Sequence, residues 1–355
     1  MFDRDFFSGK KVLITGHTGF KGTWMCELLV DAGAEVTGYA LKPPTKPSLF
    51  ELCHMSERMR SIEGDVRDLE HLKRVFEETQ PEIVIHMAAQ PLVRESYQNP
   101  VYTYDVNVMG TVNVMECVRF SKSVKSFLNV TTDKVYLNKE REQGYREEEE
   151  LNGYDPYSNS KSCSELVTSS YKNSFFGESD VAISTVRAGN VIGGGDFATD
   201  RIVPDCLRAA EKRQNIIVRN PRSVRLYQHV LEPVVAYLMI AQKQYEDKSF
   251  SGSYNVGPDE SDCRTTEEVV TMFCEKWNTS ASDEIRWEDK YDGGPHEANF
   301  LKLDCSKLKE TFGWKPRWNV EIAMDKIVEW SLCYLRGENV STCMKAQIED
   351  FLSSR

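Results

Sequence analysis

Short apolar runs alternate with helix-like stretches through the first half of the chain. The runs with the pattern of buried strands are 11–15, 34–40, 82–88, 126–132 and 181–187. Between them, apolar residues recur at helical spacing over 20–33, 69–79, 98–121 and 155–176. Strands that alternate with helices predict βαβ units and a parallel sheet covered on both faces. We therefore predict an α/β fold with a doubly wound, Rossmann-type parallel sheet.

The second half of the chain has a different pattern. After about Gly193, short strands, loops and helices are mixed, as in "SYNVGPDE" and "FLKLDCSKLKETFGW". This change predicts two domains. We expect residues 1–190 to form the first domain and residues 191–355 to form a smaller, mixed α/β lobe. We expect some exchange of chain between the two lobes.

Composition and charge narrow the class of protein. The 355 residues are 40% hydrophobic and 28% charged, which is ordinary for a soluble globular protein. The net charge of −11 argues against binding to nucleic acid or to an anionic membrane. A phosphate-bearing ligand therefore needs local arginines, backbone amides or helix ends to hold it.

The cysteines and the apolar runs indicate a compartment. The ten cysteines contain no C-x-x-C pair and the six histidines show no ligand spacing, which favours reduced thiols over a disulfide framework or a zinc site. The start, "MFDRDFFSGKKVLIT", lacks the apolar stretch of a signal peptide. The longest apolar run, "VVAYLMIA", is far too short to span a bilayer. We expect a cytoplasmic protein without a bound metal.

Three glycines follow the first predicted strand. The stretch "LITGHTGFKG" places Gly16, Gly19 and Gly22 directly after the strand and at the start of a helix. A tight turn, the close approach of backbone to a pyrophosphate and the packing of helix on sheet each need a residue without Cβ. A lone glycine triplet is explained equally well by a tight turn. The strand and helix on either side favour dinucleotide binding here.

The end of the second predicted strand leaves NAD and NADP both open as the cofactor. "TGYALK" has Ala40 where NAD enzymes of this fold carry an acid for the ribose 2′-hydroxyl, and Lys42 nearby suits the extra phosphate of NADP. Asp65 in "EGDVRD" and the segment "HMAAQ" (86–90) end two later strands. At those strand ends they can reach the adenine and the ribose.

A tyrosine and a lysine lie four residues apart on a predicted helix. Tyr157 and Lys161 in "GYDPYSNSKSCSELV" therefore share one helix face. Such a pair is often a surface pair by chance, but here it accompanies a dinucleotide fold. For tyrosine, with a pKa of about 10, to act as a base at neutral pH takes roughly 4 kcal/mol. One ammonium at about 4 Å in a partly shielded site supplies a similar amount. Thr132, at the preceding strand end, would hydrogen-bond the alcohol being oxidised.

An acid and a base follow the fourth predicted strand. Asp133 and Lys134 come after "SFLNVTT", and in an open α/β sheet ligands bind outside the carboxyl ends of the strands. In a random loop such a pair would be a solvated turn. Beside the Tyr157 and Lys161 pair, it indicates proton transfer.

The motifs "GHTGFKG", "TTDKVY" and Tyr157-x-x-x-Lys161 resemble those of the extended short-chain dehydrogenase/reductases, the NAD-dependent epimerase/dehydratase family. The blocks "HMAAQPLVRESY", "VRAGNVIGGGDF", "QHVLEP" and "PHEANFLKLDCSK" extend the resemblance over nearly the whole chain and to its nucleotide-sugar 4,6-dehydratases. Lys134 stands where the branches acting on dTDP- and GDP-sugars commonly have Glu, so the chain most resembles the branch that acts on CDP-glucose. Phe197 and Leu226-Tyr227 depart from that branch's Trp and Pro-Trp.

The resemblance implies a reaction on a nucleotide sugar. Tyr157 takes the proton of the glucose 4-hydroxyl as hydride passes to the nicotinamide. Asp133 acts as the acid for the hydroxyl that leaves position 6, and Lys134 handles the proton at position 5, directly or through water. Hydride then returns to position 6 and yields a 4-keto-6-deoxy sugar. The catalytic residues are thus Thr132, Asp133, Lys134, Tyr157 and Lys161.

The resemblance also implies binding residues and an assembly. NAD, with NADP not excluded, would be bound by Gly16, Thr18, Gly19, Phe20, Lys21, Gly22, Asp65, Val66, Ala88, Ala89, Gln90, Asn107, Thr131, Tyr157 and Lys161. The nucleotide sugar would be bound by Asn190, Arg201, Arg225, Gln228 and His229. The helices over 98–121 and 155–176 would pair across the axis of a homodimer or a homotetramer.

Three other functions are compatible with parts of this pattern. A 4,6-dehydratase of another nucleotide sugar would share all of it. A nucleotide-sugar 4-epimerase or 4-ketoreductase would use Thr132, Tyr157 and Lys161 but not the acid Asp133. A regulator that only senses a dinucleotide would need neither Tyr157 nor Lys161.

Overall fold

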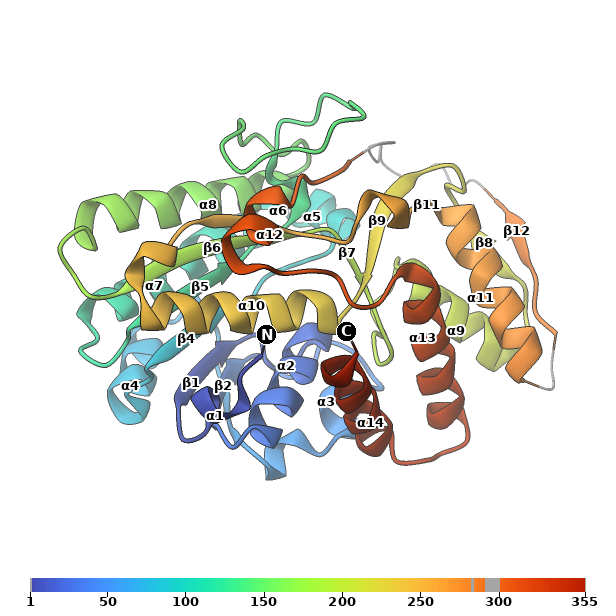
Figure 1. Cartoon of the computed structure of the whole chain (residues 1–355), viewed down its shortest axis with the longest axis horizontal. Helices are drawn as coiled ribbons and strands as arrows, with labels where there is room; N and C mark the ends of the chain where they lie inside the picture. The colour runs from blue at the N-terminus through green and yellow to red at the C-terminus, as the bar shows by residue number, and fades with distance from the viewer. Residues whose placement is uncertain (1, 282–283, 291–300, 355) are drawn as a thin grey trace.

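A seven-stranded parallel sheet forms the centre of the computed structural model, which describes residues 2–281, 284–290 and 301–354 (Figure 1). The block "PHEANF" lies outside the described residues. Neighbouring strands pair in parallel throughout. Across the sheet they are β10 (Ser253–Val256), β6 (Ala182–Ala188), β5 (Ser126–Val130), β4 (Ile83–His86), β1 (Lys11–Thr15), β2 (Glu35–Ala40) and β3 (Arg60–Glu63). This confirms the predicted Rossmann-type α/β fold.

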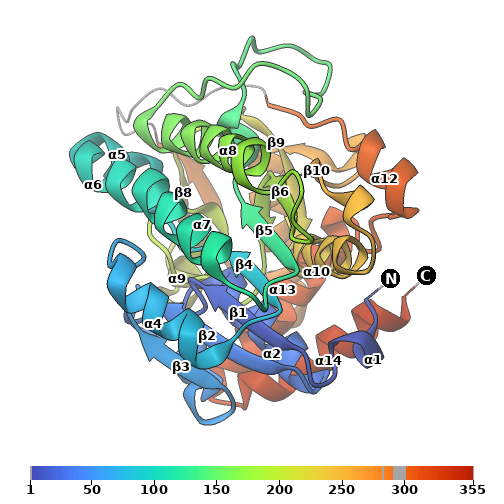
Figure 2. The ribbon, with the colours of Figure 1, turned by 90° about the vertical axis from the view of Figure 1, so that its left-hand side faces the viewer.

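The central strands are continuous apolar runs. Because successive side chains point to opposite sides of a sheet, each run supplies apolar residues to both faces. Ile14 and Leu128 face one apolar cluster, whereas their neighbours Leu13 and Phe127 face another. Helices cover both faces of the sheet, as Figure 2 shows. On one side lie α2 (Phe20–Asp31), α10 (Leu231–Glu246) and α14 (Val340–Ser353), and on the other α4 (Leu69–Thr79), α7 (Gly110–Phe120) and α8 (Pro156–Phe175).

The second lobe is built on two small sheets. A three-stranded sheet holds β11 (Cys263–Thr265), β9 (Val224–His229) and β7 (Asn190–Ile192), and a two-stranded sheet holds β12 (Trp287–Asp289) and β8 (Ile216–Val218). Packed with them around one apolar cluster are α9 (Ile202–Lys212), α11 (Thr266–Ser280) and α13 (Val320–Leu335). The short helices of the chain are α1 (Arg4–Phe7), α3 (Leu49–Leu52), α5 (Val93–Gln98), α6 (Pro100–Tyr104), α12 (Ser306–Phe312), η1 (Met55–Glu57), η3 (Asp133–Val135), η4 (Lys248–Phe250) and η5 (Glu260–Asp262).

Two details differ from the sequence prediction. The stretch predicted as one helix over 98–121 is divided into α6, the π-helical turn η2 (Asp105–Met109) and α7. The strand β3 was not predicted, because it is an edge strand with mostly exposed side chains and carries no apolar run. The strand β10, from the second half of the chain, completes the central sheet beside β6. Among the described residues, no helix is both long and apolar enough to cross a membrane.

Candidate functional site

The three glycines after β1 form a turn that leaves α2 open at its start. Gly16 has φ +78°, a left-handed conformation that favours glycine, and a Cβ there would lie 2.8 Å from the backbone N of Ala88. A Cβ on Gly22 would lie 2.4 Å from the Gly16 carbonyl oxygen, whereas one on Gly19 meets nothing closer than 3.4 Å. Gly19 precedes α2 and caps it with no side chain. The first turn of α2 therefore offers its amides to an anion such as a pyrophosphate.

Other predicted dinucleotide residues lie at the same edge of the sheet, where β2, β3 and β4 end. The Thr18 hydroxyl donates to the Leu41 carbonyl oxygen at 3.0 Å. The Asp65 carboxylate, after β3, is bound by Arg67, whose hydrogen bonds hold the pKa of Asp65 below its ordinary value. Val66 packs against Gly110 at the start of α7. Ala88, Ala89 and Gln90 follow β4.

Asn107, on the π-helical turn, joins the end of β4 to α8. Its amide oxygen accepts from the Gln90 backbone N at 2.8 Å, and its amide nitrogen donates to the Gln90 carbonyl oxygen at 3.1 Å and to Ser160 Oγ at 2.9 Å. The Ser160 hydroxyl in turn donates to the Tyr157 carbonyl oxygen at 2.7 Å. Asn107 thus sets the position of Gln90 and of the first turn of α8.

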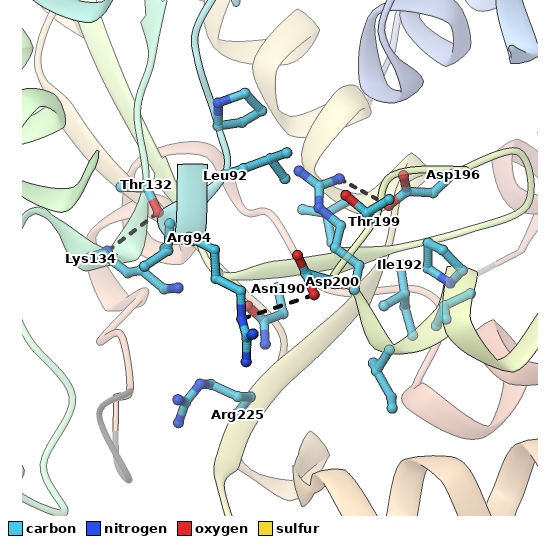
Figure 3. Close-up of a pocket in the computed structure, with 18 of the residues that line it drawn as sticks. Leu92, Arg94, Thr132, Lys134, Asn190, Ile192, Asp196, Thr199, Asp200 and Arg225 are labelled. Atoms are coloured by element: carbon cyan, nitrogen blue, oxygen red, sulfur yellow. Dashed lines mark hydrogen bonds and ion pairs between the residues drawn. The ribbon is translucent and has the colours of Figure 1, made fainter. Parts of the chain in front are cut away.

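A cavity of about 720 Å³ lies where β5 and β6 end, between the central sheet and the second lobe. Its wall is formed by residues from α2, from the segments that follow β4, β5 and β6, from α8 and from the second lobe. Figure 3 shows part of this wall. The predicted site residues that line the cavity are Phe20, Lys21, Thr131, Thr132, Asp133, Lys134, Tyr157, Asn190, Arg201 and Arg225.

Local structure at the start of α8 directs Tyr157 to the cavity. Asp155 caps the helix by accepting from the Ser158 backbone N at 2.9 Å, and Pro156 occupies the first helical position. Tyr157 therefore belongs to the first turn, where it shares a side-chain hydrogen bond with Thr132. Burial raises the pKa of Tyr157 to about 12, against the opposing effect of the Thr132 hydrogen bond.

Lys161 lies one turn further along α8 and is buried. Its Nζ donates to the Val130 carbonyl oxygen at 3.1 Å. Burial lowers the pKa of Lys161 to about 7, and Lys21 adds to this effect while Glu165 opposes it. Burial is the largest influence on the pKa of both groups, and the expectation that Lys161 lowers the pKa of Tyr157 stays a prediction.

Asp133 and Lys134 meet Thr132 at the end of β5. Asp133 is 5% exposed and accepts a hydrogen bond from the Thr132 hydroxyl at 2.9 Å. Burial raises the pKa of Asp133, while Lys134, Thr132 and Arg225 act in the opposite direction. A carboxyl group with a raised pKa holds its proton more readily, as a proton donor requires. Lys21 faces the same region, and burial lowers its pKa to about 8.

The five residues predicted to bind a nucleotide sugar are divided between the cavity and the core. Arg201 lines the cavity and forms an ion pair with Asp196 at 2.9 Å, and Asn190 and Arg225 also line it. Gln228 and His229 are instead buried and do not belong to the wall of this cavity, so its geometry does not support the prediction that they bind the substrate.

Gln228 and His229 are both buried because β9 is covered on both faces. Gln228 donates to the Val256 carbonyl oxygen at 3.1 Å. The His229 ring packs at 4.9 Å from the ring of Trp318 and 5.7 Å from that of Trp24. Burial lowers the pKa of His229 to about 3, so it stays neutral. Both residues belong to β9, which is buried on both faces and contacts α10 and α13.

Two cavity arginines were not predicted from the sequence. Arg94 from α5 and Arg219 after β8 line the cavity, and both approach Asp200. Figure 3 shows Arg94 and Arg225 extending into the cavity from different elements. The block "HMAAQPLVRESY" runs from the end of β4 into α5 and contains Arg94, so its position after a strand of the central sheet could have indicated a role in the site. Arg219 has no comparable local signal, because it follows a short strand of the second lobe.

No group of three or more His, Cys, Asp or Glu side chains is arranged to hold a metal ion within the described part of the chain. The ring nitrogens of His86 instead contact the hydroxyls of Thr15, at 2.7 Å, and Thr111, at 3.2 Å.

Known proteins match this chain over most of its length. A family model described as GDP-mannose 4,6 dehydratase matches residues 13–327. A CDP-glucose 4,6-dehydratase of Salmonella typhimurium is 48% identical over 360 residues, covering 100% of this chain and 99% of the relative. A dTDP-D-glucose 4,6-dehydratase of Mus musculus is 26% identical over 331 residues, covering 90% of this chain and 88% of the relative.

Solved structures share the fold at lower identity. A dTDP-glucose 4,6-dehydratase of Bacillus anthracis in complex with NAD has a TM-score of 0.76 at 19% identity, covering 94% of this chain and 100% of that one. A UDP-glucose 4-epimerase of Thermotoga maritima with UDP-glucose has a TM-score of 0.76 at 20% identity, covering 91% of this chain and 99% of that one.

Proposed function

Because the chain belongs to the GDP-mannose 4,6 dehydratase family, we propose that it is an NAD-dependent hydro-lyase that converts CDP-glucose to CDP-4-keto-6-deoxyglucose. The observation that carries this proposal is the meeting of Asp133 and Lys134 with Thr132 and Tyr157 in one cavity. An epimerase uses the last two but has no need of an acid at Asp133. The 48% identity to a CDP-glucose 4,6-dehydratase supports CDP-glucose over other nucleotide sugars.

The glycine turn and the strand ends fit a dinucleotide. The open start of α2 suits the pyrophosphate, and the segments after β3 and β4 suit the adenosine half, with NADP as the less supported alternative to NAD. NAD bound there would supply the hydride chemistry of the reaction, in which hydride leaves sugar carbon 4 and returns at carbon 6. Within this chain, residues 1–190 hold the cofactor and the catalytic residues, and residues 191–355 hold most of the substrate.

The chain's own residues move the protons of this reaction. Thr132 orients the sugar 4-hydroxyl, and Tyr157 accepts its proton as carbon 4 becomes a ketone. That ketone acidifies carbon 5, whose proton passes to Lys134. Asp133 protonates the hydroxyl leaving carbon 6, which departs as water. Lys134 then returns its proton to carbon 5 as hydride is returned to carbon 6. Tyr157 releases the proton it accepted and Asp133 regains one, through solvent, so the net change is the loss of one water. The raised pKa of Asp133 supports its role as proton donor.

Arginines of the cavity suit the diphosphate of the substrate. Arg201 and Arg225 are the predicted ligands, and Arg94 and Arg219 add two further guanidinium groups to the same wall. A guanidinium group binds phosphate oxygens in pairs, which fixes orientation as well as supplying charge. Asn190 supplies an amide beside them.

We also propose that the chain forms a homodimer through α6, α7 and α8, with a homotetramer as the larger alternative. Large apolar side chains are exposed along these helices, among them Val101 at 82% and Phe120 at 67%. Leu166 and Phe175 on α8 are also exposed. Light scattering of the purified protein and of a Val101→Glu, Leu166→Glu variant tests this interface, since charges there would yield monomers.

The function is tested with a panel of nucleotide sugars and the Asp133→Asn variant. The parent should convert CDP-glucose in preference to dTDP-glucose, GDP-mannose and UDP-glucose, with mass spectrometry detecting the loss of one water. Asp133→Asn keeps the shape but removes the transferable proton, so dehydration should slow by roughly 10²- to 10⁴-fold. Reduced nicotinamide should then accumulate, as measured by rapid-mixing absorbance.

Asp5→Asn, at an exposed position of α1, is the matched control and should behave as the parent. A parent that interconverts 4-epimers without losing water would make the protein an epimerase. An Asp133→Asn variant that dehydrates CDP-glucose at the parental rate would remove Asp133 from the mechanism.

A further inference from the structure

The segment 131–136, which carries Thr132, Asp133 and Lys134, is held at both ends by one buried ion pair. At its first residue, the Thr131 hydroxyl donates to Oε1 of Glu165 at 2.5 Å. At its last residue, Nη1 of Arg187 donates to the Tyr136 hydroxyl at 2.8 Å.

Glu165 and Arg187 face each other in a fully bonded arrangement. Arg187 Nε donates to Oε1 of Glu165 at 3.0 Å, and Nη2 donates to Oε2 at 2.9 Å. Thr185 adds a hydroxyl donor to Oε2 at 2.7 Å. Both charged side chains are 3% exposed. A two-point pair with every oxygen engaged has a defined geometry and little freedom to shift.

Neither partner touches the cavity. Glu165 lies on α8 one turn after Lys161, and Arg187 lies in β6. Neither residue belongs to the cavity wall. Any effect of the ion pair on the reaction therefore passes through the residues it holds.

The far end of the segment is also tied to the second half of the chain. The Tyr136 hydroxyl donates to the Asn255 side-chain oxygen at 2.7 Å, on β10. The Tyr136 ring stacks on Tyr145 with 5.2 Å between centroids. Arg187 Nη1 further donates to the Glu147 carbonyl oxygen at 2.9 Å. Tyr136 is thus the point at which the ion pair, β10 and the loop before α8 meet.

The two halves of the proposed reaction depend on different parts of this segment. Thr132 follows directly on the anchored Thr131 and is hydrogen-bonded to Tyr157. Asp133 and Lys134 lie in the middle, between the two anchors. Loss of the anchor at Tyr136 therefore frees Asp133 and Lys134 before it frees Thr132.

We propose that the Glu165–Arg187 ion pair, acting through Tyr136, positions Asp133 and Lys134 and so governs elimination of water more than oxidation at carbon 4. This inference rests on the proposed function. It makes Glu165, Arg187 and Tyr136 positioning residues. A misplacement of about 1 Å at a reacting group is enough to slow a step by about a hundredfold.

The test removes one hydroxyl from a buried ring. Tyr136→Phe deletes both the bond from Arg187 and the bond to Asn255 that tie the end of the segment, and keeps the ring stacked on Tyr145. The control is Tyr254→Phe, at the residue next to Asn255 in β10. It deletes a hydroxyl that donates to the Phe250 carbonyl oxygen at 2.6 Å and does not contact the segment 131–136. Rapid-mixing absorbance of the nicotinamide gives the oxidation rate, and mass analysis gives the dehydration rate.

Tyr136→Phe should lower the dehydration rate by about tenfold or more while the oxidation rate and the KM for CDP-glucose stay within about twofold of the parent. Tyr254→Phe should leave the ratio of the two rates unchanged. At the other anchor, Thr131→Val should impair the reaction and Thr131→Ser, which keeps the hydroxyl, should restore it.

The outcomes separate this inference from the proposed function. A parent that dehydrates no nucleotide sugar overturns the proposed function and the inference together. An active parent whose Tyr136→Phe variant oxidises and dehydrates at the parental ratio overturns the positioning role alone. Equal losses in both rates, matched by Tyr254→Phe, would also overturn it, because they indicate a general loss of stability.

Discussion

Lys161→Met should stabilise the fold while it impairs the proposed reaction. Lys161 is 4% exposed, and burial lowers its pKa from 10.5 to about 7. A lysine whose pKa is this much lower in the folded than in the unfolded state reduces the free energy of unfolding by about 5 kcal/mol at a pH where it is charged in both states. Methionine has a similar length and no charge, so the substitution removes this cost.

The gain depends on pH with a defined sign. Below about pH 7 the lysine is protonated in both states and the cost is complete, and above about pH 10.5 it is neutral in both and the cost disappears. The cost is thus about 4 kcal/mol at pH 7 and about 2 kcal/mol at pH 9. The lost hydrogen bond to the Val130 carbonyl oxygen takes back about 1 kcal/mol. Lys161→Met should therefore gain about 3 kcal/mol at pH 7 and about 1 kcal/mol at pH 9.

Urea unfolding, followed by circular dichroism without cofactor or substrate, measures this gain at the two pH values. The difference between variant and parent isolates Lys161, since the other titrating groups are common to both. Lys122→Met, at an exposed position after α7, is the control and should change stability by less than about 0.5 kcal/mol. A Lys161→Met variant that is less stable than the parent at pH 7, or whose gain is the same at both pH values, would refute the reasoning.

Two further substitutions test the cavity and the glycine turn. Arg225→Ala should raise the half-saturating concentration of CDP-glucose more than it lowers turnover at saturation, since the diphosphate contact is common to ground state and transition state. Steady-state kinetics beside the exposed Arg286→Ala check this, and an effect confined to turnover contradicts it. Gly22→Ala places a Cβ 2.4 Å from the Gly16 carbonyl oxygen and should destabilise the fold by about 1–3 kcal/mol. Urea unfolding measures this loss, and Gly177→Ala, which meets nothing within 4 Å, should show none.

The local parts of the fold and of the candidate site were predictable from the sequence. The strand β1 and the helix α4 have the predicted bounds. Tyr157 and Lys161 lie on one helix, and the 131–134 segment follows a central strand as expected. Such features depend on residues within a few positions of each other, where apolar periodicity and glycine placement act directly. The roles of the site residues remain predictions.

Contacts between distant parts of the chain were not predictable in the same way. Gln228 and His229 have polar side chains of the kind that bind ligands, yet both are buried in the core. Gln228 donates to the Val256 carbonyl oxygen, and His229 packs against two tryptophans. Arg94 and Arg219 reach one cavity from elements more than a hundred residues apart. No local pattern records such a meeting, because it depends on how the second lobe packs against the sheet.

The sequence by itself determined the βαβ alternation, the glycine turn and the order of Thr132, Asp133 and Lys134 after a strand, since each follows from neighbouring residues. Tertiary structure alone decided which buried charges pair. Glu165 comes from a helix and Arg187 from a strand. Once paired, they hydrogen-bond Thr131 and Tyr136, the two ends of one segment. A buried charge is tolerated only beside its opposite and with its hydrogen bonds complete. That condition is met only once α8, β5 and β6 have packed together.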